Sequence, residues 1–88
     1  MTQNQLALLR ALRHLGGDEY GPVDGLREAV EFRVGAIRDA DLVALIDRSV
    51  EDGLVEVQDG EPGMLRPTRL TLRGSQKVRE YDRKPLSD

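Results

Sequence analysis

The chain has 88 residues, of which 39 % are hydrophobic, 33 % charged and 3 % aromatic, and its formal net charge is −3. This length fits one domain, and the scarcity of aromatic residues means that the core is built from Leu, Val, Ile and Ala. The sequence has no Cys, which excludes disulfides, thiolate metal sites and a cysteine nucleophile. It also has no apolar run near the roughly 20 residues of a membrane span. The N-terminal MTQNQLALLR lacks the basic start of a signal peptide, so we expect a cytoplasmic protein without membrane contact.

Charge is distributed unevenly along the chain. Residues 21–62 hold four basic and eleven acidic side chains, whereas residues 63–88 hold seven basic and three acidic ones. The middle of the chain is therefore acidic and its C-terminal part is basic. This pattern, with the negative total, argues against a protein that coats nucleic acid over its whole surface.

The first predicted helix begins after Thr2, because Thr2-Gln3-Asn4-Gln5 fits a capping box. Gly16-Gly17 is its expected end. Its apolar residues are Leu6, Leu8, Leu9, Leu12 and Leu15. This is more leucine than one helix face needs, which favours a homodimer. Either Leu6 and Leu9 pack inward while the other three meet a second copy, or the reverse holds; alternatively, all five serve one core.

Two further helices are predicted in the acidic middle of the chain. Pro22 and Asp24 signal the start of a helix that runs to about residue 34, and Gly35 suits a left-handed C-terminal position. The next helix runs over about 39–52, with Asp39 as its cap and a glycine after it. The apolar stripes of the two helices are Leu26, Ala29, Val30 and Val34, and Leu42, Leu45, Ile46 and Val50.

The sequence of the C-terminal part of the chain predicts a hairpin followed by a short last helix. Strands are expected over 54–57 and 68–73, joined by a long loop rich in Gly and Pro. On the returning strand, alternation places Leu70 and Leu72 on one face and Arg69, Thr71 and Arg73 on the other. Ser75 suits the cap of the last helix, with Val78 and Tyr81 facing inward. The domain is expected to span 1–83, followed by a flexible tail over 84–88.

The order of helices and hairpin, together with two sequence stretches, resembles a known family. These stretches are LVALIDRSVEDGLVEV (42–57) and RLTLRG (69–74). The third helix closes on Gly-Leu-Val, and the second strand returns through Leu-Thr-x-x-Gly. Both features are similar to those of small bacterial winged helix-turn-helix transcriptional regulators. The resemblance implies an α+β, mostly helical fold with three helices, a two-stranded wing and a short C-terminal helix, in which Thr71 and Gly74 sit where the second strand bends into the last helix.

The resemblance further implies a regulator that binds double-stranded DNA through the 39–52 helix and the 54–73 wing. The corresponding DNA-contacting residues would be Arg33, Arg38, Ala40, Asp41, Ala44, Arg48, Arg66, Arg69 and Arg73. The exposed face of the helix also carries Asp39, Val43 and Asp47, and this acidity departs from the family pattern, which favours Arg, Lys and amide side chains. The alternative is a winged-helix module that binds a basic protein partner through this acidic face without reading DNA sequence.

The residues favour no enzyme. His14 is the one histidine and lies near the end of the first helix, where an interaction with the helix dipole explains it. No calcium-loop pattern occurs, and the glycine-containing stretches GDEYG and DGEPG lack the lysine of a phosphate-binding loop. We therefore expect no catalytic residues, no metal site and no cofactor.

Overall fold

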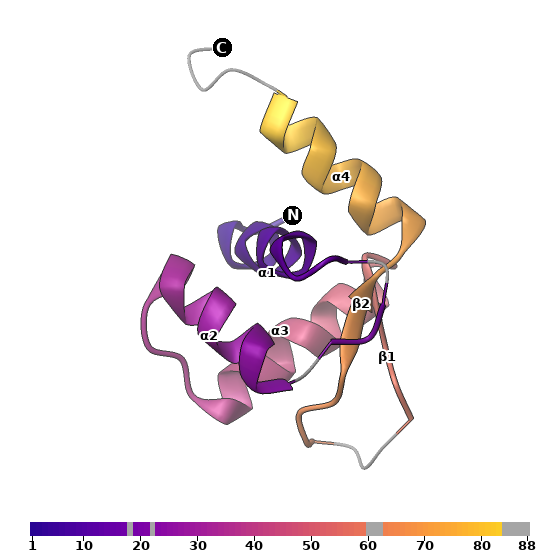
Figure 1. Cartoon of the computed structure of the whole chain (residues 1–88). Coiled ribbons are helices and arrows are strands. Elements are labelled where there is room, and N and C mark those ends of the chain that lie inside the picture. The colour runs from indigo at the N-terminus through magenta and orange to yellow at the C-terminus, as the bar shows by residue number, and fades with distance from the viewer. Residues whose placement is uncertain (18, 22, 60–62, 84–88) are drawn as a thin grey trace.

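The computed structural model describes residues 1–17, 19–21, 23–59 and 63–83. These residues form four helices and one two-stranded antiparallel sheet, which confirms an α+β, mostly helical fold (Figure 1). The elements in chain order are α1 (Gln3–His14), α2 (Val23–Val34), α3 (Asp39–Glu51), β1 (Val55–Val57), β2 (Thr68–Leu70) and α4 (Leu72–Arg83). Within these residues, no helix combines the length and apolar character needed to cross a membrane. The predictions for Pro22, for residues 60–62 of the hairpin loop and for the tail over 84–88 fall outside the described residues.

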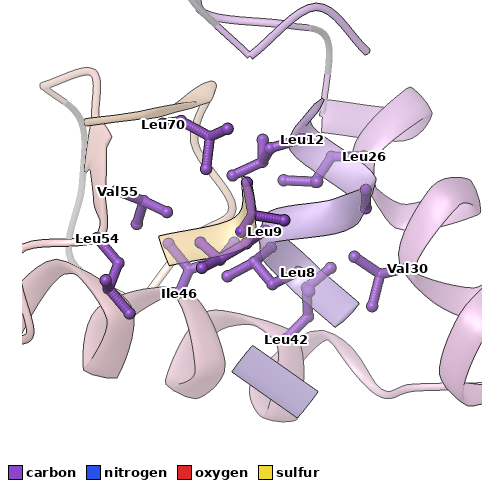
Figure 2. Close-up of a cluster of buried hydrophobic side chains, with 12 residues drawn as sticks. Leu8, Leu9, Leu12, Leu26, Val30, Leu42, Ile46, Leu54, Val55 and Leu70 are labelled. Carbon is purple, nitrogen blue, oxygen red and sulfur yellow. The ribbon is translucent and has the colours of Figure 1, made fainter. Parts of the chain in front are cut away.

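Helix α1 is the central element, since it contacts α2, α3, α4 and β2 (Figure 1). Leu8, Leu9 and Leu12 are buried together in a core that α2, α3 and the hairpin complete (Figure 2). Leu6 is half-buried against this core, and Leu15 is 40 % exposed. Both predicted divisions of the leucines between core and dimer are therefore wrong, because buried residues come from both groups.

The capping box at the start of α1 is confirmed, and it reaches further than a helix cap. The backbone N–H of Gln5 donates to Thr2 Oγ1 at 3.1 Å, and the Thr2 N–H donates to Gln5 Oε1 at 2.9 Å. Gln5 is only 1 % exposed, and its Nε2 donates to Asp52 Oδ2 at 2.8 Å. Asp52 is the C-terminal cap of α3. One buried amide thus satisfies the cap of α1 and fixes the far end of α3 against it.

Helices α2 and α3 end as the sequence predicts, but the N-terminal cap of α3 differs from the predicted one. Gly35 and Gly53 both have positive φ, at +85° and +74°, which lets the chain leave each helix without the strain of a Cβ. Asp39 is the first residue of α3, whereas Arg38 occupies the cap position and makes no side-chain cap bond. The predicted Asp39 cap is therefore wrong; instead, its carboxylate lies in the first turn, where the helix dipole stabilises negative charge.

The hairpin passes into α4 without a connecting loop. The β ladder pairs Val55 with Leu70, and the Thr71 N–H extends it by donating to the Leu54 carbonyl at 3.1 Å. The Thr71 hydroxyl accepts a hydrogen bond from the Gly74 N–H at 3.0 Å, as an N-terminal helix cap does. The predicted strand over 68–73 and the Ser75 cap are thus wrong. The strand ends at Leu70, and the residues from 72 onward are helical.

The start of α4 lies in direct contact with the entry into β1. A Cβ built on Gly74 would lie 2.0 Å from the Leu54 carbonyl oxygen, a distance that no side chain can occupy. The Thr71 Oγ1 also donates to the Gly53 carbonyl at 2.6 Å. The junction between hairpin and last helix therefore requires glycine at position 74 on steric grounds rather than for its backbone freedom.

Replacing Gly74 with Ala should destabilise the fold, because the added methyl forces the α4 backbone away from Leu54. We expect a loss of about 3 kcal/mol in unfolding free energy, at the upper end for overpacking, in urea titrations followed by circular dichroism. Gly21→Ala is the control, since nothing lies within 4 Å of its added Cβ. Equal stability of the two variants would contradict the steric role of Gly74.

Replacing Gln5 with Ala should also lower stability, because it removes the amide that joins the α1 cap to Asp52. A hydrogen bond to a charged group contributes about 2 kcal/mol, and we expect a loss of this size in the same titration. The exposed Gln3 in the same helix turn is the control, and Gln3→Ala should change little. A Gln5→Ala variant as stable as Gln3→Ala would rule out the bridging role.

Candidate nucleic-acid interface

The outer face of α3 is exposed, as the sequence predicts for a DNA-contacting helix. Leu42 and Ile46 are buried in the core, so the opposite face of α3 points to solvent. The exposed residues of α3 are Asp39, Ala40, Asp41, Ala44, Asp47, Arg48, Val50 and Glu51; Val43 is half-buried. Ala40, Ala44 and Arg48 follow at intervals of four and form one ridge along the helix. This ridge presents two methyl groups and one guanidinium, and its small residues allow close approach of a partner.

Three of the four exposed carboxylates of α3 are paired with an arginine, whereas Glu51, one turn after Asp47, makes no ion pair with a described residue. Asp39 is bound by Arg27 of α2, whose Nη1 also donates to the Ile37 carbonyl at 2.9 Å. Asp41 lies 3.0 Å from Arg38 Nε, one turn back. These pairs neutralise the N-terminal half of the α3 face, so it is less acidic than the sequence alone indicates.

The third pair joins α3 to the hairpin. Arg66 Nη2 lies 3.8 Å from Asp47 Oδ1, and 24 % of the Arg66 side chain is exposed. Arg48 makes no ion pair with any residue that the structure describes. Among the described residues, the C-terminal half of the α3 face therefore carries the paired Asp47 together with Arg48 and Glu51, which make no ion pair.

Arg69 is held on the hairpin by two neighbours. Its Nη2 and Nε donate to Glu56 Oε2 at 2.7 and 3.1 Å across the ladder, and its guanidinium lies 4.8 Å from the centre of the Tyr20 ring. The hydrogen bond to Glu56 and the charge interaction with Tyr20 raise the pKa of Arg69 above its ordinary value. The Arg69 side chain therefore stays fully charged, and its contacts with Glu56 and Tyr20 hold it in one orientation.

Arg33 and Arg73 lie apart from the other predicted contacts. Arg33 is at the end of α2, where its Nη1 donates to the Ala29 carbonyl of the same helix at 2.9 Å, and it lines grooves bounded by α1, α2 and α4, one of them together with Asp82. Arg73 lies in the first turn of α4 rather than on β2, and it lines a groove with Glu51, Asp52 and Lys77. The structure thus brings Arg38, Arg48 and Arg66 to the surface of α3 but does not place Arg33 there.

Sequence reasoning missed the pairing of the α3 carboxylates because two of the three partners come from other elements. The Arg38–Asp41 spacing of three residues is visible in the sequence and signals a helix-surface pair. Arg27 and Arg66 carry no such signal, since they lie twelve and nineteen positions from their partners Asp39 and Asp47. Only the tertiary fold reveals that Asp39 and Asp47 of the acidic helix are paired with arginines.

Comparison of the chain with known protein families, with characterised proteins and with solved structures gave no match. The order of three helices, a hairpin and a last helix is compatible with a winged helix. Function is therefore inferred from the exposed surface of α3 and the hairpin beside it.

Proposed function

We propose that this chain is a winged helix-turn-helix protein that binds double-stranded DNA and regulates transcription. In this proposal α3 enters the major groove and the β1–β2 hairpin is the wing. The observation that carries it is the exposed ridge of Ala40, Ala44 and Arg48. Alanine methyl groups suit contact with the thymine methyl, and an arginine at the end of the ridge suits bidentate donation to guanine.

Arginines beside this ridge are suited to phosphate contacts. Arg38 precedes the first turn of α3, and Arg66 reaches its C-terminal half from the hairpin. Their ion pairs with Asp41 and Asp47 involve exposed carboxylates, and such pairs contribute only about 0–1 kcal/mol. Exchange of the carboxylate for a DNA phosphate is therefore favourable when counterions are released from the duplex.

The competing proposal is capture of a basic protein by the acidic face of α3. The ion pairs of Asp39, Asp41 and Asp47 reduce the negative charge that a basic partner would meet on this face. Either partner would exchange these weak pairs, since DNA phosphates would take the arginines and a basic protein would take the carboxylates. The exposed ridge of Ala40, Ala44 and Arg48 is the feature that favours DNA over a basic protein.

Binding of a mixed-sequence duplex, measured by fluorescence anisotropy, should weaken steeply with added salt. The Arg38→Ala/Arg66→Ala variant should bind more weakly and lower the slope of log K against log salt by about 1.8, since each phosphate contact contributes about 0.9. Arg10→Ala/Arg13→Ala is the matched control, because it removes two arginines that are paired with Asp82 on the α1–α4 side. An unchanged slope in the first variant would exclude its two phosphate contacts. Absence of binding by the wild-type protein at low salt would reject DNA binding altogether and favour a protein partner.

Arg48 is the residue of the ridge suited to reading a base. On a duplex selected by the wild-type protein from a random library, Arg48→Ala should weaken binding by about tenfold or more, since one bidentate base contact is worth about 1–3 kcal/mol. Arg79→Ala removes an equal charge from the exposed side of α4 and should have little effect. Equal losses in the two variants would show that Arg48 acts through net charge alone.

A further inference from the structure

Phe32 is the one phenylalanine of the chain, and it points away from the core. Its side chain is 87 % exposed on α2, whereas Leu26 and Val30 of the same helix are buried. A groove of about 400 Å³ runs beside it and is lined by Leu15, Gly25, Glu28, Ala29 and Arg33, among others. An exposed aromatic residue next to a groove floored by small residues is typical of an interaction surface.

This surface lies on the flank of α2 that faces away from α3. On the other flank, Arg27 donates to the Ile37 carbonyl and Glu31 accepts from the Ile37 N–H at 3.3 Å, which ties α2 to the turn before α3. At about 100° per residue, Glu28 lies about 100° and Phe32 about 140° from Arg27 around the helix axis. A partner that covers Phe32 would therefore leave the exposed ridge of α3 uncovered.

We propose that the Phe32 flank of α2 binds the same flank of a second copy, with the two α2 helices antiparallel about a two-fold axis. The charges are self-complementary in this arrangement. When Glu28 stands opposite Arg33 of the second copy, Ala29 stands opposite its Phe32, and symmetry repeats both contacts. Each phenylalanine then enters the groove that Gly25 and Ala29 help to line in the second copy.

The local contacts of the two charged residues agree with this arrangement. Arg33 donates to the Ala29 carbonyl of its own helix and has no carboxylate partner among residues 1–17, 19–21, 23–59 and 63–82. Glu28 likewise makes no ion pair with any of these residues. Arg10 and Arg13, on the neighbouring helix, are both paired with Asp82 and do not compete for Glu28.

The association is measured on the full chain without DNA, so its outcome is separate from that of the proposed DNA binding. Sedimentation equilibrium over about 10 µM to about 1 mM, a range that covers weak dissociation constants, should show a monomer–dimer equilibrium. Phe32→Ser should raise the dissociation constant at least about tenfold, as expected for an aromatic anchor. Leu72→Ser is the matched control, since Leu72 is 77 % exposed on α4, and it should leave the constant unchanged. Far-UV circular dichroism should show that both variants keep the wild-type fold, because both side chains are exposed.

A charge exchange tests the antiparallel register. Glu28→Arg places two like-charged pairs across the axis and should weaken association several-fold, on the scale of exposed ion pairs. Adding Arg33→Glu restores both opposite-charge pairs and should return the constant to near the wild-type value. A wild-type chain that stays monomeric at the highest concentration would overturn the proposal, as would equal effects of Phe32→Ser and Leu72→Ser. Failure of the double exchange to restore association would overturn the register.

Discussion

Burial of the aliphatic side of α1 is the constraint on which the rest of the structure depends. This helix contacts α2, α3, α4 and β2, so one run of leucine and alanine supplies the surface on which the other elements pack. Among the described elements, α1 contributes the most buried hydrophobic residues, namely Ala7, Leu8, Leu9, Ala11 and Leu12. The buried Gln5 adds direction to this packing, since its hydrogen bonds fix the start of α1 against the end of α3. The hydrophobic contacts of α1 extend over several elements, whereas the hydrogen bonds of Gln5 select one arrangement of α1 relative to α3.

Local sequence signals predicted the elements well wherever they act within a few residues. The capping box of α1 and the left-handed glycines after α2 and α3 are of this kind. The boundary between β2 and α4 was not predicted, because Leu70 and Leu72 are two positions apart and this alternating apolar pattern is typical of a strand. Thr71 instead ends the ladder with its backbone and caps the helix with its hydroxyl. The contact of Gly74 with Leu54 depends on tertiary structure and has no local signal beyond the glycine itself.

For the candidate interface, the sequence indicated which α3 residues are exposed but not their electrostatic state. Helical spacing alone places Ala40, Ala44 and Arg48 on the outer ridge. Pairing of the acids depends on residues brought in by α2 and by the hairpin, which spacing does not predict. The exposure of Phe32 could be predicted from the sequence, because Phe32 lies outside the apolar stripe that contains Leu26 and Val30. In a chain with few aromatic residues, however, a phenylalanine is readily assigned to the core. One surface for nucleic acid and another for self-association would thus lie on different helices, α3 and α2.

The hydrogen bond from the Leu70 N–H to the Gly17 carbonyl, at 2.9 Å, has a consequence for solubility. A two-stranded sheet has two open edges, and unpaired edge groups are templates for aggregation with other chains. Here the segment after α1 covers the outer edge of β2, and the Leu70 side chain packs close to the Gly17 backbone. The edge that remains among the described residues is β1, which is only three residues long. A short edge is a poor template, so the hydrogen bond from β2 to the turn after α1 helps to protect the hairpin from growing into an intermolecular sheet.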